Sequence, residues 1–60
     1  MLNIALELPD DLAWAFAEFL KRAGYRDYRQ LAASDQEAWD MQEAGERLRA
    51  AFAEKGIAPR

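Results

Sequence analysis

The first eight residues alternate between apolar and polar or small side chains, and this alternation constrains the fold more than any other feature. The apolar positions are Leu2, Ile4, Leu6 and Leu8. A period of two predicts a β-strand with one apolar face. Pro9 follows; it cannot donate a hydrogen bond to a sheet, and its fixed φ suits the first turn of a helix. The sequence therefore predicts a strand that ends at Leu8 and a helix that begins just after it.

The predicted first helix follows the proline and ends at Gly24, for which we expect a left-handed cap. Asp10 and Asp11 favour the positive N-terminus of a helix, and Lys21 and Arg22 favour its negative C-terminus. Apolar side chains recur at i, i+3 and i+4 spacing, and we expect them to form a buried stripe. The stripe consists of Leu12, Ala15, Phe16, Phe19, Leu20 and Ala23.

Two further helices are predicted in the second half of the chain. Asp27 and Gln30 resemble a capping box, which predicts a short helix over Asp27–Ala33. Ser34 and Glu37 form a second capping box, and the helix that follows is expected to run for about five to six turns, to Gly56. The apolar stripe expected on that helix contains Ala38, Met41, Ala44, Gly45, Leu48, Ala51 and Phe52.

The predicted fold class is therefore α+β, in one domain of residues 1–60, with one N-terminal strand followed by two or three helices. A lone strand leaves its backbone donors and acceptors unpaired, and no other segment predicts a convincing strand. A chain of 60 residues without cysteine also lacks disulfides to stabilise a small core. We therefore expect the strand to pair across a homodimer, through Leu2, Ile4, Leu6 and Leu8, or with the sheet of a partner protein.

Composition excludes several classes of function. The chain has no cysteine and no histidine, and it has no Gly-rich phosphate loop. We therefore expect no catalytic, metal-binding or cofactor-binding residues and no enzymatic activity. No apolar run approaches the roughly 20 residues that span a bilayer, and the N-terminus lacks the pattern of a signal peptide. These observations favour a cytoplasmic protein without membrane contact.

The most distinctive charged segment lies in the first half of the long predicted helix. Twelve residues there contain no Lys or Arg and five carboxylates: Asp35, Glu37, Asp40, Glu43 and Glu46. Such a segment is either a solvated helix face or a surface that mimics nucleic-acid phosphates and binds a basic groove of another protein. Trp39 lies within this segment, and Trp14 lies off the expected buried stripe. Both tryptophans either pack against the rest of the chain or anchor a partner.

Ile4–Gly24 resembles the first half of ribbon-helix-helix repressors and antitoxins, with a strand, Leu-Pro, an acidic cap, a helix and a glycine. The resemblance implies a dimer whose paired strands read the DNA major groove. The matching outward positions are Asn3, Ala5 and Glu7, and only Asn3 suits base recognition. Direct DNA binding is therefore disfavoured. A small basic set with interleaved tyrosines is the one other candidate for a nucleic-acid contact: Lys21, Arg22, Arg26 and Arg29 with Tyr25 and Tyr28.

Short length and a net charge of −3 make the chain similar in type to the anti-CRISPR proteins of phages and mobile elements, several of which are DNA mimics. This resemblance implies an inhibitor that occupies the nucleic-acid-binding site of a partner protein such as a Cas complex. Its working surface would be the segment from Asp35 to Glu46 with Trp39 and Trp14. A ribbon-helix-helix regulator or antitoxin and a structural interaction subunit remain the two alternatives.

Overall fold

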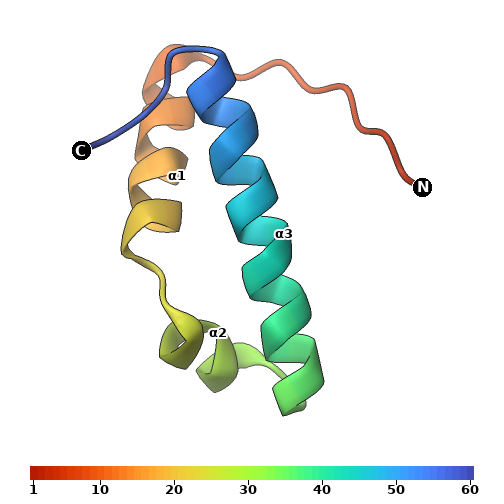
Figure 1. Cartoon of the computed structure of the whole chain (residues 1–60). Helices are drawn as coiled ribbons and strands as arrows, with labels where there is room; N and C mark the ends of the chain where they lie inside the picture. The colour runs from red at the N-terminus through yellow and green to blue at the C-terminus, as the bar shows by residue number, and fades with distance from the viewer.

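The computed structural model covers residues 1–60 and contains three helices and no strand. The helices are α1 (Asp10–Arg22), α2 (Tyr25–Leu31) and α3 (Asp35–Glu54). The long helix α3 lies beside α1 over one half of its length and beside α2 over the other (Figure 1). The chain measures 32 × 28 × 15 Å along its principal axes. α1 and α2 each pack against α3, which is therefore the central element of the fold.

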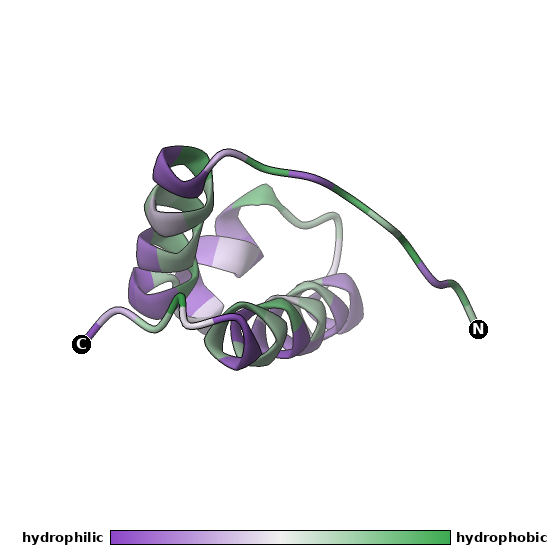
Figure 2. Cartoon of the chain, turned by 90° about the horizontal axis from the view of Figure 1, so that it is seen from above, coloured by the Kyte–Doolittle hydropathy of each residue, from purple (hydrophilic) through white to green (hydrophobic).

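The predicted α+β fold class is wrong, because the chain is all-α. Residues Met1–Pro9, here called the N-terminal arm, are extended but form no strand. They project away from the helices and alternate in hydropathy (Figure 2). Leu2, Ile4 and Leu6 are 83%, 76% and 72% exposed. The alternation correctly indicates an extended backbone, but a strand also needs a neighbouring strand to receive its hydrogen bonds, and this chain supplies none.

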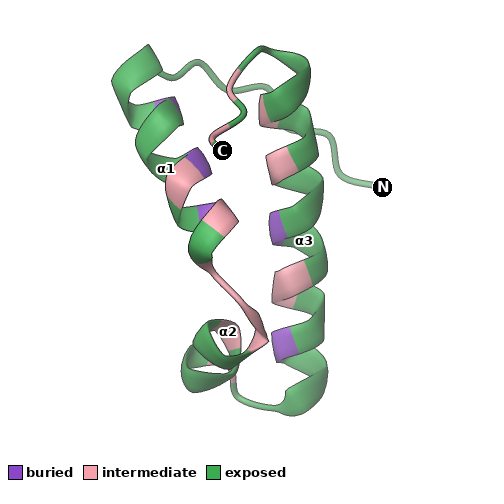
Figure 3. Cartoon of the chain, turned by 60° about the vertical axis from the view of Figure 1, so that its left-hand side comes forward, coloured by how far each residue is buried: buried purple, intermediate pink, exposed green.

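The small core lies where α1 and α2 pack against α3, and small side chains allow these helices to approach (Figure 3). Its buried members are Ala13, Ala17, Leu20, Ala38 and Gly45. The stripe predicted for the first helix is therefore correct at Leu20 but misplaced elsewhere. Three of its large members remain about half exposed: Leu12 at 53%, Phe16 at 43% and Phe19 at 50%. Of these, Phe16 reaches Phe52 of α3, with the ring centroids 6.4 Å apart, so α3 covers only part of the predicted stripe.

The junction between α1 and α2 also differs from the prediction. Gly24 has φ −112° and ψ −180°, so it is extended and is not the left-handed cap expected for α1. Its backbone N–H donates to Oδ2 of Asp27 at 2.9 Å, and α2 begins at Tyr25. Asp27 therefore caps α2 from inside its first turn. As a result, the short helix begins and ends two residues earlier than the predicted range Asp27–Ala33.

Both ends of α3 confirm the sequence prediction. Oγ of Ser34 accepts a hydrogen bond from the Glu37 N–H at 3.1 Å, and the Glu37 carboxylate accepts one from the Ala33 N–H at 2.8 Å. These two bonds satisfy otherwise unpaired donors at the helix start. At the other end Gly56 has φ +86°, and the Ile57 N–H donates to the Phe52 carbonyl at 2.9 Å. This left-handed glycine forms a Schellman motif and ends the helix.

Gly45 lies in the middle of α3 at the point where Tyr28 of α2 and Leu20 of α1 approach. A Cβ atom added to Gly45 would overlap the Tyr28 hydroxyl and would lie 3.4 Å from Cδ2 of Leu20. The missing side chain at Gly45 therefore makes room for the side chain of Tyr28.

Candidate protein-binding surface

The exposed side of α3 carries the acidic residues singled out in the sequence, but they fall into two groups. Asp35 and Glu37 lie in the first turn and are engaged by the fold itself. Oδ1 of Asp35 accepts hydrogen bonds from Nε of Arg29 at 2.6 Å and from the Tyr25 hydroxyl at 3.2 Å. Glu37 caps the helix through the Ala33 N–H. These two carboxylates therefore hold α2, and the loop that joins α2 to α3, against the first turn of α3.

The ionisation of the Asp35 carboxyl follows from its hydrogen-bond partners. The hydrogen bond from the Arg29 guanidinium, together with that from Tyr25, holds the pKa of the Asp35 carboxyl below its usual range. Partial burial raises the pKa of the Tyr25 hydroxyl, and its hydrogen bond to the carboxylate raises it further. Asp35 is thus a stable anion at neutral pH, with Tyr25 as a neutral donor.

Asp40, Glu43 and Glu46 form the second group and contact only residues of their own helix. Nε2 of Gln36 donates to Asp40 at 3.0 Å. Glu43 lies 3.5 Å from Arg47, with side chains 72% and 76% exposed. Glu46 lies 4.0 Å from Arg49. Exposed pairs of this kind contribute about 0–1 kcal/mol, so these carboxylates remain available to an incoming cation.

Trp39 lies among these carboxylates. Glu43 and Glu46 follow it by four and seven residues, which places them on the same side of the helix. The indole packs against the Tyr25 ring with the ring centroids 4.3 Å apart, yet the residue remains 55% exposed. We call Trp39, Asp40, Glu43 and Glu46 the acidic-aromatic face. It combines a fixed aromatic surface with three accessible carboxylates.

Trp14, the other tryptophan singled out in the sequence, is not part of the acidic-aromatic face. It lies on α1, is 41% exposed and takes no part in the aromatic pairs, which join Phe16 to Phe19, Phe16 to Phe52 and Tyr25 to Trp39. The structure therefore places the two tryptophans on different helices.

The basic residues noted near α2 are partly neutralised. Arg29 binds Asp35, and NH2 of Arg22 lies 3.1 Å from Oε2 of Glu18. Sequence reasoning missed that Tyr25 and Arg29 organise the start of α3, because their contacts require α2 to fold back onto α3. The capping aspartate of α2 was the available signal, but it does not indicate which surface the helix covers.

No three side chains of the His, Cys, Asp or Glu types converge as a metal-binding cluster. None of the three helices is both long and apolar enough to cross a membrane.

Comparisons with known proteins complete the description of the chain. Searches of the curated proteins and of the solved structures found no match. One family model, described as a family of unknown function, matches residues 1–60. Because this match spans the whole chain, the protein belongs to the family DUF7706.

Proposed function

We propose that this protein is a non-enzymatic inhibitor that binds the basic nucleic-acid-binding groove of another protein through its acidic-aromatic face. The observation that carries the proposal is the arrangement of Asp40, Glu43 and Glu46 around a half-exposed tryptophan that a neighbouring ring holds in place. Helix capping does not account for these three carboxylates, because the macrodipole acts only within the first turn.

The spacing of the carboxylates supports a phosphate-like role. Asp40, Glu43 and Glu46 recur every three residues, which is about 4.5 Å along the helix axis. One strand of B-DNA carries a phosphate about every 3.4 Å along its axis, so the two linear charge densities are comparable. A groove lined with Lys and Arg would therefore meet a similar row of anions on either ligand.

The aromatic member of the face suits the same kind of partner. Because Trp39 is already packed against Tyr25, binding costs it little conformational freedom. Its open ring face can receive an arginine or lysine of the partner in a cation–π contact, and tryptophan is enriched among residues that dominate binding energy. The similarity in type to anti-CRISPR proteins makes a Cas complex the first partner to test.

The two alternative functions differ in how the structure bears on them. A ribbon-helix-helix regulator depends on paired strands, and the absence of a strand removes the feature on which that expectation depended. A structural interaction subunit needs no charged surface. This function is distinguished from that of an inhibitor by whether nucleic acid competes with the protein for binding to the partner.

The proposal is tested with immobilised full-length chain and a lysate, with elution by increasing salt. We expect a captured protein to elute at moderate salt, to be displaced by added duplex DNA, and to be lost with D40N/E43Q/E46Q. The control E7Q/E18Q/E54Q removes the same number of charges elsewhere and should retain the partner. Equal capture by both triple variants, or capture that duplex DNA does not reduce, would refute the proposal.

A further inference from the structure

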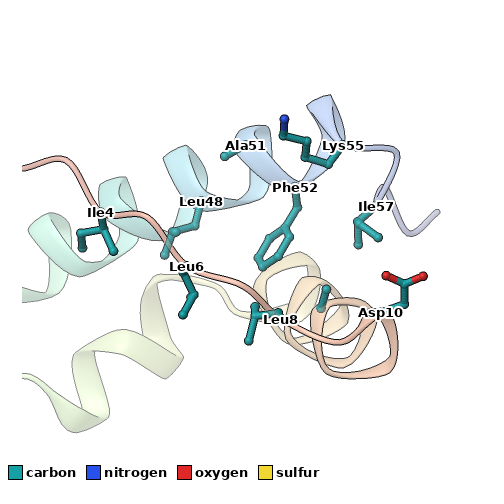
Figure 4. Close-up of a pocket in the computed structure, with 10 residues that line it drawn as sticks. Ile4, Leu6, Leu8, Asp10, Leu48, Ala51, Phe52, Lys55 and Ile57 are labelled. Carbon is teal, nitrogen blue, oxygen red and sulfur yellow. The ribbon is translucent and has the colours of Figure 1, made fainter.

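An apolar groove remains open between the N-terminal arm and the helices. The arm contributes Ile4, Leu6 and Leu8, α3 contributes Leu48 and Phe52, and the C-terminal tail contributes Ile57 (Figure 4). The only charged residues that line the groove are Asp10 and Lys55, which have opposite signs. Leu6 is 72% exposed and Leu48 is 48% exposed, so the single chain leaves much of the groove lining uncovered.

The total exposed area shows how incomplete the single chain is. It exposes 5124 Å². A folded monomer of 6.9 kDa is expected to expose about 4000 Å². The excess is about 1100 Å² per chain, so two copies that covered it would bury about 2200 Å², which lies in the range of obligate homodimers. An apolar helix face that its own chain leaves open also needs another element to bury it.

We infer that a second copy of this chain covers the apolar groove, so that the protein is a homodimer with the N-terminal arms in the interface. An interface that buried the excess area of both copies would have the size of an obligate dimer interface, and the apolar lining of the groove matches the composition of homodimer interfaces. A twofold pairing brings one Asp10 and one Lys55 from each copy, which adds no net charge. The arm already extends away from its own helices (Figure 1).

The dimer surface and the acidic-aromatic face are separate. Phe52 follows Glu43 by nine residues and Leu48 follows Trp39 by nine, which places each pair on opposite sides of α3. Asp40 shares a side of α3 with Ala51 of the groove but lies eleven residues before it, about 16 Å along the axis. Each surface can therefore be disrupted without the other.

The experiment is sedimentation equilibrium of the full chain up to about 100 µM, with helicity followed by circular dichroism. We expect twice the mass of one 6.9 kDa chain. Leu6→Glu lies outside every helix, so it breaks no helical hydrogen bond, and it should raise the dimer dissociation constant at least about 100-fold. Leu31→Glu is the matched control, because Leu31 is 85% exposed and lies outside the groove; its mass should be unchanged.

Three results would overturn the inference. These are a wild-type monomer at the highest concentration, an assembly larger than two chains, or equal dissociation by Leu6→Glu and Leu31→Glu. D40N/E43Q/E46Q should remain dimeric, so the failure of this inference is distinguishable from the failure of the proposed function.

Discussion

Gly45→Ala tests the packing at the centre of the fold. Alanine favours a helix interior by about 1 kcal/mol over glycine, so an isolated α3 would be stabilised. In the folded chain the new Cβ would overlap the Tyr28 hydroxyl and lie 3.3 Å from Cζ of the same ring. Overpacking of this kind typically costs about 1–3 kcal/mol. We expect a net loss of about 1 kcal/mol, which lowers the Tm by about 4–8 °C.

Tyr28→Phe provides the matched background, because it removes the atom with which the alanine collides. In this background Gly45→Ala should be neutral or stabilise the fold by up to about 1 kcal/mol, since the helix preference is no longer opposed. The assay is thermal and urea unfolding followed by circular dichroism, with all four chains at one concentration because association affects the Tm. A rise in Tm for Gly45→Ala in the wild-type chain would refute the packing of Tyr28 against this glycine.

Substitutions at two further positions address the start of α3. Ser34→Ala removes the side-chain acceptor of the Glu37 N–H and should cost about 1 kcal/mol in urea unfolding, whereas Ser34→Asp, which keeps an acceptor, should cost much less. Asp35→Asn removes a carboxyl whose pKa is lowered by folding; that carboxyl stabilises the fold above its unfolded pKa, and the effect is lost as the pH falls through its folded pKa. Asp35→Asn should therefore lower the Tm at pH 7 and approach the wild type in acid, and a pH-independent difference would contradict this.

The parts of the fold that the sequence predicted are those decided by local chemistry. Ser34 and Glu37 form the expected capping box, and the long helix ends at Gly56 as expected, so α3 has the predicted bounds. Each of these signals involves residues within a few positions of one another. Their hydrogen bonds form whatever the rest of the chain does.

The errors arise where a local pattern needs a distant partner. Alternation at Leu2–Leu8 predicts an extended backbone, but a strand depends on a neighbour that the chain lacks. The stripe on α1 predicts an apolar face without indicating that α3 would cover Ala13 and Ala17 rather than Phe19. The contact of Tyr25 with Trp39 likewise depends on how α2 turns back onto α3. The carboxylates of the acidic-aromatic face could therefore be predicted from the sequence, whereas the packing of Trp39 against Tyr25 could not.

The role of the acidic-aromatic face is tested most directly by an NMR titration with the protein captured in the binding assay. The chain contains two tryptophans, so its spectrum should show two indole N–H signals that separate α1 from α3. Binding should shift or broaden the Trp39 signal together with the amides of Asp40, Glu43 and Glu46, and should leave the Trp14 signal in place. A change confined to Trp14 and the N-terminal arm would contradict partner binding through α3.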